Sequence, residues 1–385
     1  MHDYVRENVM GGMQQRFFEL SKFMNSNANN LFAIEFQPSL RKLWKSASYE
    51  SIELPRPRNY PWAFRLTHYL IQAIRLGLKS PKSSRADIIY STSHSLDNVI
   101  PAFVVSRLSR RPLVVVFHHL LPEERLSPSS LFASRRLKGN TFATSVLLLF
   151  VDLIQRRMIT RIDTGFAVSN YTLNDVRNSY GLANVVLTGN GVNPPTRKRF
   201  QATFDTAFCG RLRNEKGVDT LVKAWTYVTR VRPGAKLLLI GGSASGSGVV
   251  GCQEMVRSLG LQDVVTITGF VPEQKKFELL AQSRLFALPS KIEGFGLAVL
   301  EAMSMGLPCI LSDIPALRES YDGAAIFLKN NDHYTLGRQI LDLLDDAGLQ
   351  KELSNRSLTL AEQFSWERVA NNELNVMNNL VRIYF

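Results

Sequence analysis

The chain alternates short, continuous apolar runs with helical stretches, and the alternation occurs twice. A strand that is apolar throughout must be covered on both faces, which is typical of a parallel sheet with helices on either side. The first series ends before the proline-rich, charged segment 193–200, after which a second series begins. The expected strands are 31–36, 86–92, 111–119, 163–169 and 183–192, then 206–210, 235–242, 263–269, 284–290, 307–313 and 324–328.

This pattern predicts an α/β protein built from two doubly wound, Rossmann-like domains that face a cleft. We expect an N-terminal domain over 1–195, a C-terminal domain over 196–363 and a final amphipathic helix over 364–385. In such domains ligands bind outside the carboxyl ends of the strands, so the turns that follow the strands are the places to look for a site.

The positive charge is concentrated in the first half of the chain. Residues 1–199 hold 27 Lys and Arg against 13 Asp and Glu, whereas residues 200–385 hold 19 against 20. We expect a polyanionic partner for the first half, although a basic surface without function is the alternative. The three cysteines are widely spaced and no apolar run is long enough to span a bilayer, so we predict a cytoplasmic protein, peripheral on a membrane at most.

Two carboxylates stand in the apolar stretch "LFALPSKIEGFGLAVLEAMSM" (285–305). Burying an ionised group in such surroundings costs free energy unless another group pairs with it. If no protein group does, a ligand is the candidate partner for Glu293 and Glu301. Gly294 and Gly296 favour a strand-to-helix turn that lets a ligand approach the backbone, and the helix that follows offers its amino end to an anion. Because carboxylates repel phosphate, their expected partners are the hydroxyl groups of a sugar or ribose.

A second strand-to-helix turn carries two cations, Arg211 and Lys216, in "FCGRLRNEKGVDTLVKAW" (208–225). An arginine and a lysine at a helix start predict a clamp for a diphosphate. The chain has neither an Asp-x-Asp pair nor a P-loop, so we expect no metal and no other cofactor. The glycine-rich segment 240–248 does not continue as a dinucleotide-binding motif does.

These stretches, together with "NGV" before the linker, resemble the retaining glycosyltransferases of family 4, which have the GT-B fold; the likeness runs over about 10–370. The resemblance implies a metal-independent transfer of a hexose-type sugar from a nucleotide-diphospho-sugar. It places Glu293 on the donor sugar, Glu301 on the ribose, and Arg211 and Lys216 on the diphosphate. The remaining residues that it assigns are Gly294 and Phe295 at the sugar, Gly12, Gly296 and Leu297 at the diphosphate, and His118 beside the transferred sugar.

The resemblance also implies that the last helix crosses back to the N-terminal domain, and that the acceptor's hydroxyl attacks from the face that the diphosphate leaves. His119 stands beside His118, which fits the position better; a buried core histidine is the alternative reading. No nucleic acid is expected as a partner.

Acceptor and membrane contact are predicted from the basic N-terminal half. Segments 62–80 and 132–161 combine basic clusters with apolar residues, which is typical of peripheral binding to anionic lipid. We therefore expect a lipid-linked or glycan-precursor acceptor. The alternative is that residues 147–154 simply pack on the sheet.

Three other functions compete with this interpretation. A nucleotide-sugar epimerase can use the same fold, and the basic composition suits a nucleic-acid-binding protein, although no such motif is present. A catalytically inactive scaffold is disfavoured because Glu293, Glu301, Arg211 and Lys216 are all present.

The start of the chain lacks an expected element. In the resembling family a buried strand precedes the glycine turn, whereas "MHDYVRENVM" before Gly11 is charged and has no apolar run. We expect either that the first strand is missing or that the true start lies upstream.

Overall fold

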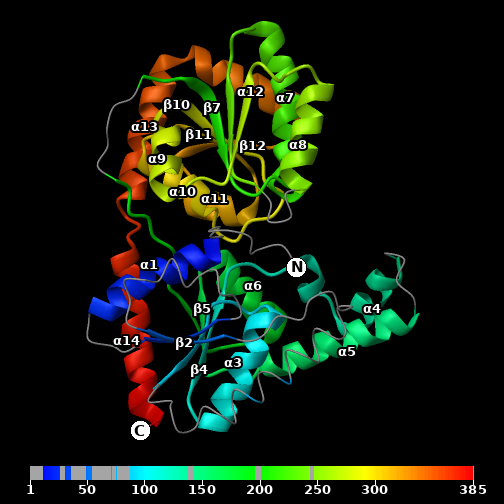
Figure 1. Cartoon of the computed structure of the whole chain (residues 1–385), viewed down its shortest axis with the longest axis vertical. Helices are drawn as coiled ribbons and strands as arrows, with labels where there is room; N and C mark the ends of the chain where they lie inside the picture. Colours follow the sequence, from blue (N-terminus) through cyan, green and yellow to red (C-terminus); the bar gives the residue numbers. More distant parts are fainter. Residues whose placement is uncertain are drawn as a thin grey trace. The chain divides into compact units, whose positions relative to one another are not determined.

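The computed structural model of the protein describes residues 12–26, 31–35, 49–53, 71, 75, 87–137, 142–195, 201–242 and 247–384 (Figure 1). The chain divides into two compact units. The N-terminal unit contains 12–189 and takes in 367–385 from the end of the chain, and the C-terminal unit spans 190–366. The expectation about residues 1–10 lies outside the described residues.

The C-terminal unit is built on a six-stranded parallel sheet. Its strands lie in the order β12-β11-β10-β7-β8-β9. Their bounds are β7 Phe204–Cys209, β8 Leu237–Ile240, β9 Val265–Gly269, β10 Ser283–Leu288, β11 Cys309–Ser312 and β12 Ala325–Leu328. Every residue of β8 and β11 is buried, as the continuous apolar runs require.

Helices cover both faces of this sheet. In Figure 1, α7, α8 and α12 lie along one face, and α9, α10 and α13 along the other. The apolar stripe of α7 is typical: Leu221, Trp225 and Val228 recur at helical spacing and are buried. The bounds are α7 Val218–Val231, α8 Ser247–Ser258, α9 Glu273–Ala281, α10 Leu297–Ser304, α11 Pro315–Tyr321, α12 His333–Asp345 and α13 Ala347–Ala361.

The strand order reverses between β7 and β10. Numbered within the unit, the order from β9 to β12 is 3-2-1-4-5-6, the arrangement of dinucleotide-binding folds. From β7 the chain moves outward to β8 and β9, then returns to β10 on the other side of β7. A crevice opens at such a point because the connections leave the two central strands in opposite directions. The turns that follow β7 and β10 therefore lie side by side.

The N-terminal unit has a four-stranded parallel sheet in the order β3-β4-β5-β6. Its core joins β4 to the helices around it through side chains such as Val115, Phe117, Ile159 and Val176. The strands are β3 Ile89–Ser91, β4 Leu113–Phe117, β5 Thr164–Ala167 and β6 Val185–Leu187. The helices are α1 Gly12–Ser26, α3 Leu96–Ser109, η3 Pro122–Arg125, α4 Pro128–Leu137, α5 Phe142–Ile159, α6 Asn170–Tyr180 and α14 Trp366–Tyr384.

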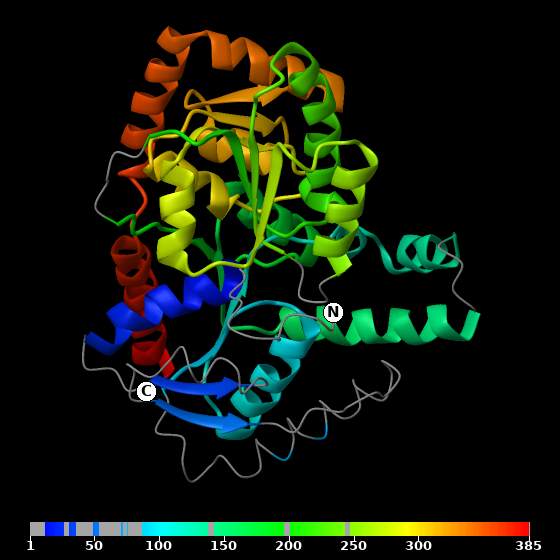
Figure 2. The same ribbon diagram turned by 45° about the horizontal axis from the view of Figure 1, so that its top comes forward.

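One strand differs from the sequence-based expectation. β1 (Leu31–Glu35) was expected among the strands of the N-terminal sheet, but it pairs in parallel with β2 (Tyr49–Glu53) in a separate two-stranded sheet (Figure 2). β2 was missed because "YESIE" contains two glutamates and lacks the continuous apolar run by which the other strands were recognised. The other ten expected strands are confirmed, with ends that agree to within five residues.

Candidate active site

The turn between β7 and α7 brings two cations to the carboxyl end of the sheet. Arg211 follows the strand, and a single 3-10 turn (η4, Asn214–Lys216) presents Lys216 immediately before Gly217. Gly217 has φ +69°, and a Cβ there would stand 1.9 Å from the carbonyl oxygen of Pro289. Glycine is therefore required both by the backbone conformation and by the close approach of the neighbouring turn.

The two turns at the strand reversal are bonded to each other. The backbone carbonyl of Glu215, in the first turn, accepts hydrogen bonds from the Lys291 amide at 2.8 Å and the Ser290 hydroxyl at 3.2 Å, both in the second. This pairing fixes the cations of one turn against the carboxylate of the other.

Lys216 and Glu293 form an ion pair across these turns. The Lys216 Nζ donates to Glu293 Oε1 at 2.6 Å and lies 3.4 Å from the Ile292 carbonyl oxygen. Their side chains are 15% and 11% exposed, so both charges are accessible at one edge yet largely removed from water. Arg211 is more exposed and lies 3.4 Å from Glu215 on its own turn.

The start of α10 is held by packing around Gly296. This residue has φ +84°, and a Cβ there would meet Leu317 Cδ2 at 2.6 Å. The Tyr321 hydroxyl donates to the Gly296 carbonyl at 3.0 Å, and Phe295 packs edge-on against the Tyr321 ring. Leu297 begins the helix, whose first amides have no acceptor within the helix. The turn thus presents backbone donors beside Lys216 and Glu293.

Glu301 has a protein partner that sequence reasoning missed. Lys276 of α9 donates to Glu301 Oε1 at 2.6 Å, and the two side chains are 13% and 4% exposed. Glu293 and Glu301, for which the sequence showed no evident protein partner, therefore each pair with a lysine. Nothing local indicated Lys276, because "EQKKFELLA" reads as an ordinary surface helix.

The expected site residues fall into both units. The C-terminal unit carries most of them around the β7 and β10 turns: Arg211, Lys216, Glu293, Gly294, Phe295, Gly296, Leu297 and Glu301. Gly12 is the first residue of α1, and His118 follows β4; both belong to the N-terminal unit.

His118 is held as a neutral imidazole. Its Nε2 lies 3.0 Å from the Thr92 carbonyl oxygen, which can only accept, so Nε2 carries the proton. Burial and the positive charge of Arg16 lower the pKa of His118 to about 3. The ring is therefore uncharged near neutral pH and offers hydrogen bonding rather than positive charge.

Two family models together match almost the whole chain. The model described as Glycosyltransferase Family 4 matches residues 10–195, and the one described as Glycosyl transferases group 1 matches residues 196–358. The two models meet within the proline-rich segment 193–200, and the turns described above fall within the second model.

Similar proteins include several sugar transferases. The O-antigen chain mannosyltransferase B of Escherichia coli is 29% identical over 186 residues, 47% of this chain and 48% of the relative. The D-inositol 3-phosphate glycosyltransferase of Paenarthrobacter aurescens is 32% identical over 171 residues, 44% and 42% of the two chains. The matched segment thus spans about half the length of these relatives.

The fold is similar to solved structures over nearly its full length. Anabaena HepE, in a complex with UDP and glucose, superposes with a TM-score of 0.75 at 16% identity and covers 97% of this chain and 98% of its own. Sucrose-phosphate synthase from Thermosynechococcus elongatus superposes with a TM-score of 0.76 at 17% identity, and the match covers 99% of this chain and 97% of that protein.

Proposed function

The chain belongs to the family 4, group 1 glycosyltransferases, and from this membership we propose that it transfers a hexose-type sugar from a nucleotide-diphospho-sugar with retention of configuration. The observation that carries the proposal is the meeting of Lys216 and Glu293 at the strand reversal, with Arg211 on the same turn. The HepE complexes with UDP, glucose and UDP-glucose support a donor of this class, because that protein shares the fold.

The proposed chemistry follows from the charges at the two turns. An incoming diphosphate attracts Lys216 and Arg211, and the amides at the start of α10 add to this attraction. Lys216 then shares its charge between the diphosphate and Glu293, whose carboxylate accepts hydrogen bonds from the sugar's hydroxyl groups. Two cations and a helix end would neutralise the leaving group, so we propose that no metal ion is required.

Retention is proposed to follow from attack on the face that the diphosphate leaves. The bond from the sugar's anomeric carbon to the diphosphate oxygen breaks, and a bond to the acceptor's hydroxyl oxygen forms. The departing diphosphate oxygen takes the hydroxyl proton. Lys216 and Arg211 stabilise the charge that develops on this oxygen, which is where preorganised cations contribute most to rate.

A donor panel tests the proposal directly. Purified protein is mixed with UDP-, GDP- and ADP-sugars, and thermal shift and slow donor hydrolysis are recorded. We expect one nucleotide class to raise the melting temperature, since a ligand that binds only the folded state stabilises it. An altered nucleotide-linked sugar formed without acceptor would instead indicate an epimerase, and no response to any donor would contradict the proposal.

We also propose that the acceptor is lipid-linked and that the outer face of α5 contacts an anionic membrane. Phe142, Val146, Phe150 and Leu153 recur at helical spacing and are 65%, 45%, 60% and 42% exposed. Segment 132–161 carries six basic residues and one acidic residue. An apolar stripe beside excess positive charge is typical of a helix that lies in a lipid interface.

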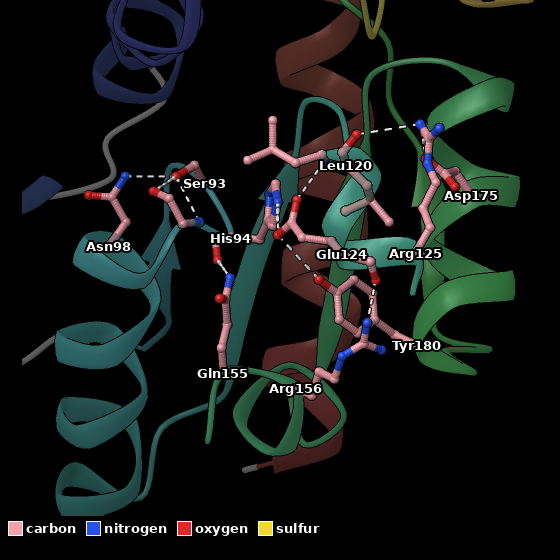
Figure 3. A network of polar contacts seen from close by, with 12 residues as sticks. Ser93, His94, Asn98, Leu120, Glu124, Arg125, Gln155, Arg156, Asp175 and Tyr180 are labelled. Carbon is pink, nitrogen blue, oxygen red and sulfur yellow. Dashed lines mark hydrogen bonds and ion pairs between the residues drawn. The ribbon is translucent and has the colours of Figure 1, made fainter. Parts of the chain in front are cut away.

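The opposite face of α5 is hydrogen-bonded to the rest of the N-terminal unit. The helix is therefore held in place although its apolar stripe is exposed. Figure 3 shows Gln155 and Arg156 pointing into a polar network around His94, Glu124 and Tyr180. Gln155 donates to the His94 carbonyl at 2.9 Å, and Arg156 donates to the Leu126 carbonyl at 2.8 Å. One face of α5 is therefore attached within the N-terminal unit, while the four apolar side chains named above are exposed.

The described part of the chain contains no helix that is long and apolar enough to cross a bilayer. The side chains of Arg135 and Arg136, and the whole of Lys138, lie outside the described residues.

Vesicle binding is the measurable consequence of this surface. Replacing Phe142 and Phe150 by serine should weaken binding to anionic vesicles about tenfold or more, because each buried phenyl ring contributes roughly 1.5–3 kcal/mol. Binding should also fall with added salt and on replacing Arg135, Arg136 and Lys138 by serine. Val231→Ser, which alters a similarly exposed residue on α7, is the control. Equal recovery with neutral and anionic vesicles would contradict the proposal.

A further inference from the structure

The ion pair between Lys276 and Glu301 has no role in the chemistry described so far. Glu301 lies in the second turn of α10, and its side chain is 4% exposed. Lys276 comes from α9 and places its ammonium group 2.6 Å from Glu301 Oε1. Burial alone would lower the pKa of Lys276, but the attraction of Glu301 raises it above its ordinary value, so the lysine is charged.

Two other titratable side chains of the described residues that interact with Glu301 are uncharged. Cys209, at the end of β7, is a neutral thiol whose pKa burial raises to about 12. Tyr321 of α11 also stays protonated, because burial and then Glu293 raise its pKa well above 10, and its hydroxyl is bonded to the Gly296 carbonyl. Glu293 is paired with Lys216. Lys276 is the cation in direct contact with the Glu301 carboxylate.

We propose that Lys276 is a positioning residue for the nucleotide half of the donor, holding Glu301 in place and ionised so that it accepts hydrogen bonds from the ribose hydroxyl groups. This inference rests on the proposed function, which assigns Glu301 to the ribose. A carboxylate accepts through both oxygens, whereas a protonated carboxyl group gives up part of that capacity to its own hydrogen. A buried carboxylate that loses its cation takes up a proton at higher pH.

The position of Lys276 separates nucleotide binding from the transfer step. It lies on α9 and not on the turns after β7 and β10, where the two cations and Glu293 gather. Its loss should therefore change affinity for the nucleotide much more than turnover at saturating donor.

The chain offers a matched control on the same helix. Lys275 is the preceding residue, 51% exposed, in a surface pair with Glu278 at 3.3 Å. Lys275→Met removes the same charge and the same side chain from α9 without touching Glu301. Lys276→Arg keeps the cation, and Glu301→Gln removes the titrating group.

Calorimetric binding of UDP, GDP and ADP to the full chain provides the first readout. With the nucleotide that the wild type binds, Lys276→Met should raise the Kd by about tenfold or more near pH 6.5, the usual effect of losing a charged hydrogen bond. The affinity should recover as pH rises and the carboxyl group ionises. Lys275→Met and Lys276→Arg should bind as the wild type does, and kcat of Lys276→Met should change less than twofold.

Unfolding without any nucleotide provides a second, independent readout. In Lys276→Met the folded state should bind a proton on Glu301 that the unfolded chain releases. The stability of this variant, relative to that of Lys275→Met, should therefore fall as the pH rises from about 5 to about 8. Adding Glu301→Gln to Lys276→Met should remove this pH dependence. A melting profile parallel to that of Lys275→Met would overturn the inference.

The nucleotide affinities also distinguish a positioning role of Lys276 from a packing defect. Wild-type affinity in Lys276→Met, or a loss that is equal at every pH and not rescued by arginine, would also overturn the inference, because a packing defect produces the latter. If the wild type binds none of the three nucleotides, the proposed function fails, while the pH profile of stability still decides whether Lys276 keeps Glu301 ionised.

Discussion

Glu293→Ala and Lys216→Ala are each expected to lower the rate of sugar transfer by about 10²–10³, the usual effect of removing one electrostatic contact to a transition state. Lys216 would stabilise the departing diphosphate, and Glu293 would hold the sugar from which it departs. The two side chains meet at 2.6 Å across the strand reversal, so either substitution also leaves its partner without a counter-charge. The measurement is kcat/KM with a donor that the wild type uses.

Because the two residues act together, the double variant should be little worse than the poorer single variant. Lys223→Ala is the control: it removes a lysine from an exposed position on α7 and should keep wild-type activity. Circular dichroism should show the same helix content in all variants. Turnover near that of the wild type in either single variant would show that the β7 and β10 turns do not form the site.

Arg16→Met is expected to lower the free energy of unfolding by about 3–5 kcal/mol, which is the usual effect of removing one partner of a buried ion pair. Arg16 of α1 donates to Glu373 Oε1 of α14 at 2.6 Å, and the side chains are 2% and 0% exposed. Tyr90 donates to the other carboxylate oxygen at 2.9 Å, and Thr188 contacts the first at 3.1 Å. Without Arg16 the Glu373 carboxylate would be a buried, uncompensated charge.

The charge states support this expectation. Burial alone would lower the pKa of Arg16, but Glu373 raises it above its ordinary value. Burial and then Glu373 raise the pKa of Tyr90 well above 10, so its hydroxyl remains a donor. The network therefore persists across the whole physiological pH range and joins α1, β3, the end of β6 and α14.

Urea unfolding would measure the loss, and hydrogen exchange at the α1 and α14 amides would assign it to this unit. Arg382→Met makes the same substitution at an exposed position of α14 and should change stability by less than about 0.5 kcal/mol. Replacing both Arg16 and Glu373 with Met and Leu should recover much of the loss, because no charge is then left buried. A cost below about 1 kcal/mol for Arg16→Met alone would contradict the expectation.

Local sequence carried most of the information about the candidate site. Gly217 and Gly296 stand at strand-to-helix turns that the sequence indicated, and the structure shows that each has a positive φ and no room for a Cβ. Arg211, Lys216 and Glu293 stand in these turns and could be identified with them. Lys276 could not, because its partner is 25 residues away and its own helix shows no signal.

Other features depended on which side of an element faces solvent. The composition of α5 suggested either membrane contact or core packing, and the structure shows that one face is buried and another exposed: Val151 is 4% exposed and Phe150 60%. β2 has no continuous apolar run, so its sequence did not predict a strand.

The sequence by itself determined the described strands other than β2, the helices between them and the two glycine turns, because continuous apolar runs and glycines that permit a positive φ are features of a few neighbouring residues. Only the tertiary structure decided that β10 returns beside β7, and this adjacency turns two separate motifs into one site. It likewise decided that Lys216 meets Glu293 across 77 residues and that Arg16 meets Glu373 across 357. Which residues meet in such pairs depends on how the sheet and the helices pack. A local pattern of residues carries no information about that packing.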